Sequence, residues 1–222
     1  MKRVTIRVPA TTANLGPGFD AFGCALSLYT DVTFEETEWG LEITGCPEEF
    51  SGPDNLAPAF LGGLTASMVD NGLPVCVNFP LHPDWEFLAL IPDFTLSTEK
   101  ARAALPTEYS RADAVYNIAH GALVLKALEK GDEKLLRNAM QDRIHQNYRR
   151  KLIPDYDQIE ALVRTCGAAF CLSGAGPTLL CITQDEKLDE KLAKKLDSVT
   201  EHNWQMLPLH VEFQGARVIA SE

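Results

Sequence analysis

The sequence predicts an α+β fold, and two observations lead to that class. Short apolar runs rich in strand-forming residues alternate with longer segments that carry helix caps and a helical apolar spacing. In the second half, these elements follow one another as strand, helices, strand, strand, helix and strand, the order of a ferredoxin-like domain with inserted helices. Because Pro80–Asp84 has the composition of a linker, we place a boundary there, giving domains 1–82 and 83–222.

Alternating apolar residues and turn residues define the elements before this boundary. The predicted strands cover residues 3–8, 25–34, 40–44, 64–69 and 75–79. Between the first two strands, the glycines and proline of Pro9–Asp20 predict a loop. Asp54 or Asn55 caps a short predicted helix that Gly62-Gly63 ends. Asn71-Gly72 predicts a hairpin turn between the last two strands.

Helix caps locate most of the elements after the boundary. The predicted strands cover residues 86–91, 168–172, 179–183 and 206–213, and the predicted helices cover 97–105, 110–130, 132–147, 154–166 and 185–198. Ser110 and Asp113 form a capping box at the start of the longest of these helices. Leu188, Leu192 and Leu196 recur every fourth residue and predict one buried face for the last helix.

Composition and charge narrow the classes of function. The formal net charge of −11 argues against a nucleic-acid partner, because phosphate backbones select basic surfaces. Met1–Val8 is not followed by the apolar run of a signal peptide, and we find no apolar stretch of membrane-spanning length, so we expect a cytoplasmic protein. The six cysteines form no CxxC pair and predict buried free thiols, and the five histidines are scattered, so we predict no metal site.

The stretch Ser173–Thr178 lies between two apolar runs and predicts a strand, a tight glycine turn and a second strand. Gly174 and Gly176 carry no Cβ, so that neighbouring backbone N–H groups can crowd together around an anion. Ser173, Gly174 and Gly176 are therefore candidate phosphate-binding residues. The alternative is a glycine hairpin without a ligand.

Several further motifs accompany this loop. They are Pro9–Asp20, Pro53–Pro58 with Gly62-Gly63, Ser97–Arg102 and Tyr148-Arg149. Together, and in this order, they resemble the homoserine kinases of the GHMP kinase superfamily. The resemblance implies a ribosomal-S5-type N-terminal domain on a ferredoxin-like C-terminal domain. It also implies transfer of the γ-phosphoryl group of ATP, with Mg²⁺, to the hydroxyl of L-homoserine in threonine biosynthesis, and a homodimer.

The chain departs from the family at one place. Members carry a Gly/Ser-rich loop of the form P-x-x-x-G-L-G-S-S-A that wraps the ATP phosphates, and a nearby helix supplies an acidic Mg²⁺ ligand. Here the chain runs from Cys46–Phe50 to Pro53-Asp54-Asn55 without that segment, and Gly52 stands where the family has a histidine. The N-terminal domain is thus internally shortened, and we expect a retained amino-acid site beside an impaired ATP site.

The resemblance assigns the carboxylate of homoserine to two arginines, Arg102 and Arg149, whose guanidinium groups match a carboxylate in geometry. From the residues alone, a solvated charge on a short helix is favoured for Arg102, and a surface charge at a helix C-terminus for Arg149. The resemblance reverses both judgements. Asp54 matches the aspartate of the family's Pro-Asp-Asn motif and is carried over as a substrate-binding residue. If Asn55-Leu56-Ala57 marks a deletion junction, Asp54 belongs to a different strand end.

Two loop residues and one helical residue complete the candidate site. The resemblance places Asp20 near the ammonium group and Asn14 near the reacting hydroxyl, as the catalytic pair. From the residues alone, Asn14 is a turn former and Asp20 an N-cap. Thr98 either hydrogen-bonds near the hydroxyl or caps its helix.

Three further interpretations compete with a homoserine kinase. They are a binding module that holds an amino acid without chemistry, an inactive remnant with impaired folding, and a kinase for another small alcohol. The last is disfavoured by Asn14–Asp20, which matches the homoserine kinases closely. Separate titrations with homoserine and with an ATP analogue distinguish the first two.

Overall fold

The computed structural model describes residues 3–37, 40–44 and 53–221, and it divides into two compact units. Unit 1 comprises Met1–Thr12, Asp20–Phe79 and Val211–Glu222, and unit 2 comprises Ala13–Phe19 and Pro80–His210. These units differ from the continuous domains 1–82 and 83–222, because the end of the chain pairs with its beginning and the loop after the first strand groups with unit 2.

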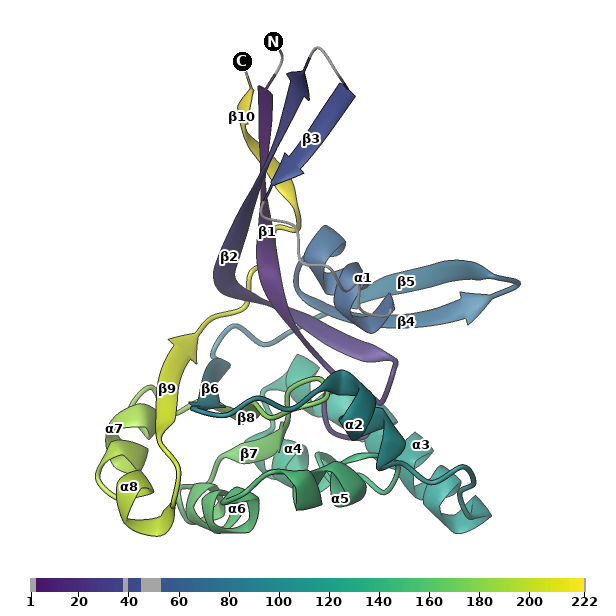
Figure 1. Cartoon of the computed structure of the whole chain (residues 1–222). Helices are drawn as coiled ribbons and strands as arrows, with labels where there is room; N and C mark the ends of the chain where they lie inside the picture. Colours follow the sequence, from purple (N-terminus) through teal and green to yellow (C-terminus); the bar gives the residue numbers. More distant parts are fainter. Residues whose placement is uncertain (1–2, 38–39, 45–52, 222) are drawn as a thin grey trace. The chain divides into compact units, whose positions relative to one another are not determined.

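Unit 1 is a sheet with one short helix (Figure 1). Its elements are β1 (Arg3–Ala13, of which the last residue groups with unit 2), β2 (Phe22–Thr37), β3 (Gly40–Thr44), α1 (Pro53–Leu61), β4 (Leu64–Asp70), β5 (Leu73–Phe79) and β10 (Arg217–Ser221). The strand order is β10-β1-β2-β4-β5, and β3 pairs with β2. The predicted helix and the Asn71-Gly72 hairpin are confirmed.

Two predictions for this unit need correction. The first strand continues through Ala13, so that residues 9–13 are strand and the loop is shorter than predicted. The strand β10 was not predicted, since Val218, Ile219 and Ala220 are exposed and carry no alternating apolar pattern. Its antiparallel pairing with β1, from Val4 opposite Ser221 onward, is a long-range contact that local sequence does not encode.

Unit 2 has the ferredoxin-like order of elements with inserted helices, as predicted. Its elements are β6 (Glu86–Pro92), α2 (Thr98–Ala103), α3 (Arg111–Lys130), α4 (Glu133–Ala139), α5 (Gln146–Arg149), the 3₁₀ turn η1 (Arg150–Leu152), α6 (Tyr156–Thr165), β7 (Ala169–Leu172), β8 (Leu179–Thr183), α7 (Leu188–Ala193), α8 (Leu196–Val199) and β9 (Trp204–Leu209). The sheet order is β7-β8-β6-β9, with antiparallel pairing throughout.

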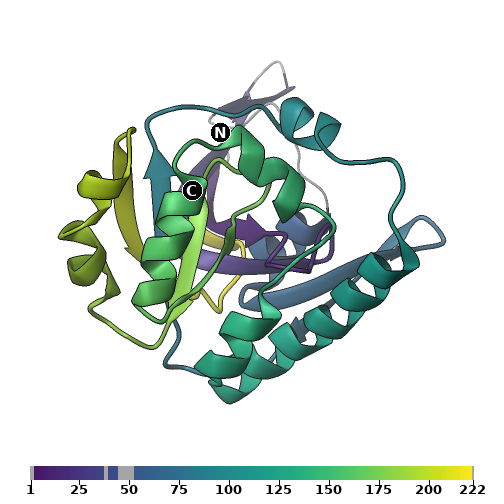
Figure 2. The same ribbon diagram turned by 90° about the horizontal axis from the view of Figure 1, so that it is seen from below.

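The sheet of unit 2 is buried on both faces. Alternate strand residues, including Leu88, Leu90 and Leu172, join one core cluster with the apolar faces of α6, α7 and α8. Their neighbours Phe87 and Ala89 face the other way and are buried as well. This double burial explains why the strands read as continuous apolar runs. The longest helix of the described residues, α3, packs against α4 (Figure 2) and buries Asn117, Gly121, Val124, Ala127 and Leu128.

Two predicted helices are interrupted. The helix predicted over 132–147 ends at Ala139, and α5 begins only at Gln146. Between them, the carboxylate of Asp142 accepts hydrogen bonds from the backbone N–H groups of residues 144–146 and so starts a new turn. The helix predicted over 185–198 is divided into α7 and α8.

The remaining expectations concern cysteines and membranes. Cys24, Cys171 and Cys181 are buried free thiols as predicted, whereas Cys76 and Cys166 are half-buried. Cys46 lies outside the described residues, as do Pro47–Gly52, where the family loop is missing. In the part of the chain that the structure describes, no helix has both the length and the apolar character to span a bilayer.

Candidate active site

The carbonyl oxygen of Gly174 is the point where three predicted site residues meet. The side-chain amide of Asn14 donates to it at 3.0 Å, and Nη1 of Arg149 donates to it at 3.3 Å. Both donors and the acceptor belong to unit 2. Asn14 adopts a left-handed backbone with φ of 57°, which an asparagine tolerates better than most residues. Segments far apart in the sequence thus converge on one atom.

Arg149 is almost fully enclosed, with 2% of its surface exposed. Its Nε donates to the carbonyl of Ala101 at 3.3 Å, so that α5 is tied to α2 as well as to the glycine loop. Its guanidinium carbon lies 5.0 Å from the ring centre of Phe19, a cation–π contact. Sequence alone suggested an exposed charge at a helix end. The burial corrects that alternative, because a guanidinium is rarely enclosed unless polar groups surround it.

α2 carries two further candidates for the amino-acid substrate. Thr98 and Arg102 are both exposed. The helix cap is Ser97, whose hydroxyl accepts from the backbone N–H of Lys100 at 3.2 Å, so capping does not require Thr98. Because Ala101 directly precedes Arg102, the bond from Arg149 to Ala101 links the segments of both candidate arginines.

A buried polar network that the sequence did not reveal holds the loop after β1. The carboxamide of Asn117 donates to the carbonyl of Pro17 at 3.3 Å and to the carboxylate of Asp142 at 2.7 Å. One ring nitrogen of His145 donates to the carbonyl of Gly16 at 2.8 Å. Asn117, Asp142 and His145 follow no recognisable spacing in the sequence. Only their hydrogen bonds in the folded chain identify them.

The glycine loop Ser173–Thr178 forms the predicted tight turn between β7 and β8. Its backbone N–H groups are largely engaged within the chain: Ser173 donates to Thr178, Gly174 to Ala13 and Gly176 to Ser173, at 2.9 to 3.0 Å. Gly174 has φ of 61° and open space where a Cβ would lie. In this conformation, the three N–H groups predicted to hold a phosphate are satisfied by carbonyl oxygens of the protein.

Two candidate carboxylates belong to unit 1. Asp20 is exposed, and its backbone is left-handed with φ of 51°. Asp54 lies in the first turn of α1 and is 3% exposed. The backbone of Asp54 passes so close to Gly23 of β2 that a Cβ at Gly23 would come within 2.0 Å of the Asp54 carbonyl oxygen.

The described residues do not provide a set of donors for a metal ion. Among residues 3–37, 40–44 and 53–221, no three or more His, Cys, Asp and Glu side chains gather in a way that could hold one. In unit 2, the carboxylate of Asp142 accepts hydrogen bonds from Asn117 and from three backbone N–H groups.

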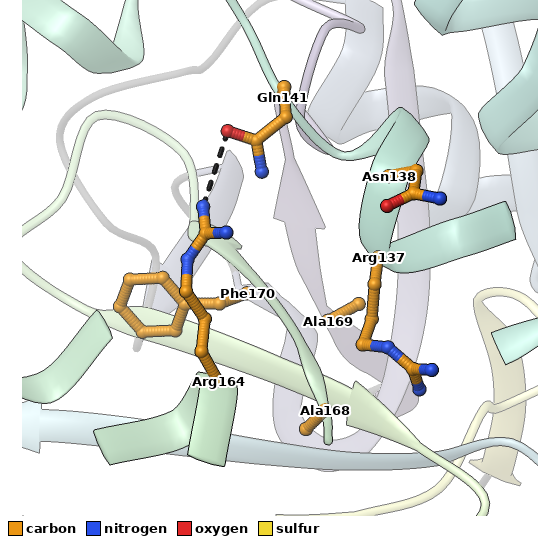
Figure 3. Close-up of a pocket in the computed structure, with 7 residues that line it drawn as sticks. All are labelled: Arg137, Asn138, Gln141, Arg164, Ala168, Ala169 and Phe170. Carbon is orange, nitrogen blue, oxygen red and sulfur yellow. Dashed lines mark hydrogen bonds between the residues drawn. The ribbon is translucent and has the colours of Figure 1, made fainter. Parts of the chain in front are cut away.

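A cavity of about 230 Å³ lies elsewhere in unit 2 (Figure 3). Its lining residues are Arg137, Asn138, Gln141, Arg164, Ala168, Ala169 and Phe170. Arg164 donates to Gln141 and pairs with Glu160 at 2.8 Å, and Arg137 lies 3.8 Å from Glu133. Because each arginine faces a carboxylate of its own helix, the cavity has no excess positive charge, and the residues predicted from the sequence do not line it.

Comparisons with known proteins identify the family of the chain. Residues 124–202 match the family described as GHMP kinases C terminal. The chain is 33% identical to a homoserine kinase of Clostridium beijerinckii over 295 residues, covering 97% of this chain and 98% of that protein. It is 30% identical to a homoserine kinase of Clostridium botulinum over 297 residues, with 99% of both chains covered.

Because these alignments are much longer than the 222 residues of this chain, they contain positions of the relatives that have no counterpart here.

Solved structures share the fold. A homoserine kinase of Cytophaga hutchinsonii superposes with a TM-score of 0.86 at 19% identity, covering 98% of this chain and 97% of that one. A structure described as a putative homoserine kinase of Listeria monocytogenes gives a TM-score of 0.72 at 27% identity, covering 98% and 99%.

Proposed function

Because the chain belongs to the homoserine kinase family of GHMP kinases, we propose that it transfers the γ-phosphoryl group of ATP to the side-chain hydroxyl of L-homoserine. One observation carries this proposal further than the family does. Asn14 and Arg149, which the family resemblance assigns to the hydroxyl and the carboxylate of the substrate, both donate to the Gly174 carbonyl. Their meeting supports an amino-acid site in unit 2.

The proposed roles follow the chemistry of the substrate. Arg149 and Arg102 bind the carboxylate, since guanidinium groups offer paired N–H donors. Asp20 binds the ammonium group, and Asp54 is a further substrate-binding residue in the same unit as Asp20. Asn14 and the exposed hydroxyl of Thr98 hydrogen-bond to the reacting hydroxyl.

Phosphoryl transfer depends mainly on alignment and on stabilising charge. The hydroxyl oxygen of homoserine forms a bond to the γ-phosphorus while the bond from that phosphorus to the β–γ bridging oxygen breaks. ADP leaves, and the hydroxyl proton passes to water. A fixed Arg149 and a fixed Asn14 hold the two ends of the substrate, so the hydroxyl is oriented before the reaction begins.

The nucleotide half of the site differs most from that of the family. The sequence lacks the family's phosphate loop, and the N–H groups of Ser173, Gly174 and Gly176 donate to backbone oxygens. We therefore expect a KM for ATP well above that of relatives with the full loop. In the part of the chain that the structure describes, no three His, Cys, Asp or Glu side chains gather as metal ligands, and the Mg²⁺ that the resemblance implies stays a prediction. A homodimer and a cytoplasmic location stay predictions.

The test is ADP release by the purified chain with Mg-ATP, with and without L-homoserine. We expect homoserine-dependent ADP formation that is lost in Asp20→Ala. Calorimetric titration with L-homoserine and, separately, with an ATP analogue extends the test. Binding of homoserine without binding of the nucleotide would favour the amino-acid-binding module, and binding of neither by a folded chain would favour the inactive remnant.

A further inference from the structure

His145 is buried completely at the start of α5 and contacts both the loop after β1 and Arg149. Its side chain has an exposed fraction of 0%. Nε2 lies 2.8 Å from the carbonyl oxygen of Gly16, and Nδ1 lies 3.4 Å from Nη1 of Arg149. The ring stacks on Phe19 at 5.2 Å between centres. All four residues belong to unit 2.

Two contacts of the ring indicate which nitrogen carries the proton, and the buried carboxylate of Asp142 lies 4.0 Å from Nε2, the nitrogen that donates. A carbonyl oxygen only accepts, so Nε2 must carry the hydrogen that it donates to Gly16. A guanidinium only donates, so Nδ1 must present a lone pair to Arg149. These two contacts favour the neutral Nε2–H tautomer of His145. An imidazolium would set an N–H group and a positive charge against the guanidinium.

These bonds close a ring of contacts. Asn14 donates to the Gly174 carbonyl, Arg149 donates to the same carbonyl and to His145, and His145 donates to Gly16. Asn14 and Gly16 lie on one loop, so the ring begins and ends on the same segment. Gly16 itself is held closely, because a Cβ there would come within 2.4 Å of the sulfur of Met140.

We propose that His145 is a positioning residue of the amino-acid site, which as a neutral Nε2–H tautomer locks Arg149 to the loop that carries Asn14. Its contribution to substrate binding rests on the proposed function. Without the His145 ring, which bridges Gly16 and Arg149, Arg149 keeps its bonds to Ala101 and Gly174 but loses one acceptor. The carbonyl of Gly16 loses the N–H group that donates to it. The two substrate contacts then move independently, and the entropy of fixing them must be supplied on binding.

Two variants each remove one of the two hydrogen bonds that the His145 ring makes with Gly16 and Arg149. His145→Gln can place an amide N–H near Gly16 but leaves no acceptor at the Nδ1 position. His145→Asn can place an acceptor near Arg149 but does not reach Gly16. We expect each variant to bind L-homoserine at least tenfold more weakly. Calorimetry measures the affinity at a temperature below the unfolding temperature of that variant. The matched control is His120→Gln, which removes a ring that bonds to the Tyr116 carbonyl at 2.8 Å on α3 and should leave binding unchanged.

Nitrogen-15 NMR of the histidine rings gives a readout that does not depend on substrate. We expect the His145 signals, identified by their loss in His145→Gln, to show a protonated Nε2 and an unprotonated Nδ1 at neutral pH. A protonated Nδ1 would overturn the proposal, as would homoserine binding that is unchanged in both folded variants. If the unsubstituted chain does not bind homoserine, the proposed function fails, and the NMR tautomer alone decides whether the bridge exists.

Discussion

Asn14 donates its side-chain amide to the carbonyl of Gly174 across a separation of 160 residues, at 3.0 Å. The bond joins the loop after the first strand to the glycine turn between β7 and β8. Both segments were candidate parts of one site on sequence grounds, and this contact places them together within unit 2.

Arg149→Lys should weaken binding of L-homoserine tenfold to a hundredfold. A lysine cannot reach the carbonyls of Ala101 and Gly174 with the same fixed geometry, and lost bonds to a charged group cost about 1.5 to 3 kcal/mol. Calorimetry measures the effect. Arg143→Lys is the matched control, because Arg143 is half-exposed on the adjoining segment. Equal affinities for both variants would contradict a substrate role for Arg149.

Substitutions at Asn14 should separate backbone conformation from hydrogen bonding. Asn14→Gly retains the left-handed φ at little cost, whereas Asn14→Ala adds a strain of about 1 kcal/mol. Both remove the bond to Gly174. We therefore expect both variants to lose homoserine-dependent ADP release, while urea unfolding shows the alanine variant to be the less stable one. Normal ADP release by Asn14→Gly would show that the side chain is dispensable.

Asp155 should make the stability of the protein depend on pH in the acid range. Burial alone would raise the pKa of this carboxylate, but hydrogen bonds from the backbone of Glu201, the indole of Trp204 and both the backbone and ring of His202 hold its pKa below the ordinary value. A lowered pKa in the folded state stabilises it above the ordinary carboxyl pKa of about 3.9, and this stabilisation is lost as the pH falls through the folded-state value.

Urea unfolding from pH 7 to pH 2 measures this contribution. The stability difference between the unsubstituted chain and Asp155→Asn should be largest near neutral pH and should shrink below about pH 4. Asp157→Asn is the control, because that side chain is exposed and lies in the first turn of α6, which Asp155 directly precedes. A stability difference that does not change with pH would mean that the charge of Asp155 does not contribute to the stability of the fold.

The buried thiols should be inert in the native state. Burial raises the pKa of Cys24 and of Cys171 to about 12, and it raises that of Cys181 as well, so the reactive thiolate is scarce at pH 8. In a Cys46→Ser background, an aromatic disulfide reagent should label Cys76 and Cys166 first and the other three only on unfolding. Fast labelling of Cys171 in the native chain would indicate an opening of the core at β7.

The sequence alone determined those helices and turns whose signals, such as caps and turn residues, lie within a few residues of the element itself. The capping hydroxyls of Ser97 and Ser110 lie within a few residues of the N–H groups that they accept from, and the Asn71-Gly72 turn sets its hairpin without help from elsewhere. The order of elements in unit 2 likewise predicted its sheet. The motif order predicted the family, because five separated motifs together are specific although each alone is not.

Tertiary structure decided what depends on distant partners. The edge strand β10 has exposed apolar residues and becomes a strand by pairing with β1. Asp142 interrupts a helix because its carboxylate accepts three backbone N–H groups ahead of it. Arg149 looks like a surface charge in the sequence and is enclosed because carbonyls of α2 and the glycine turn surround it. His145 had no motif, since its role comes from two partners on separate segments, which only the folded chain brings together.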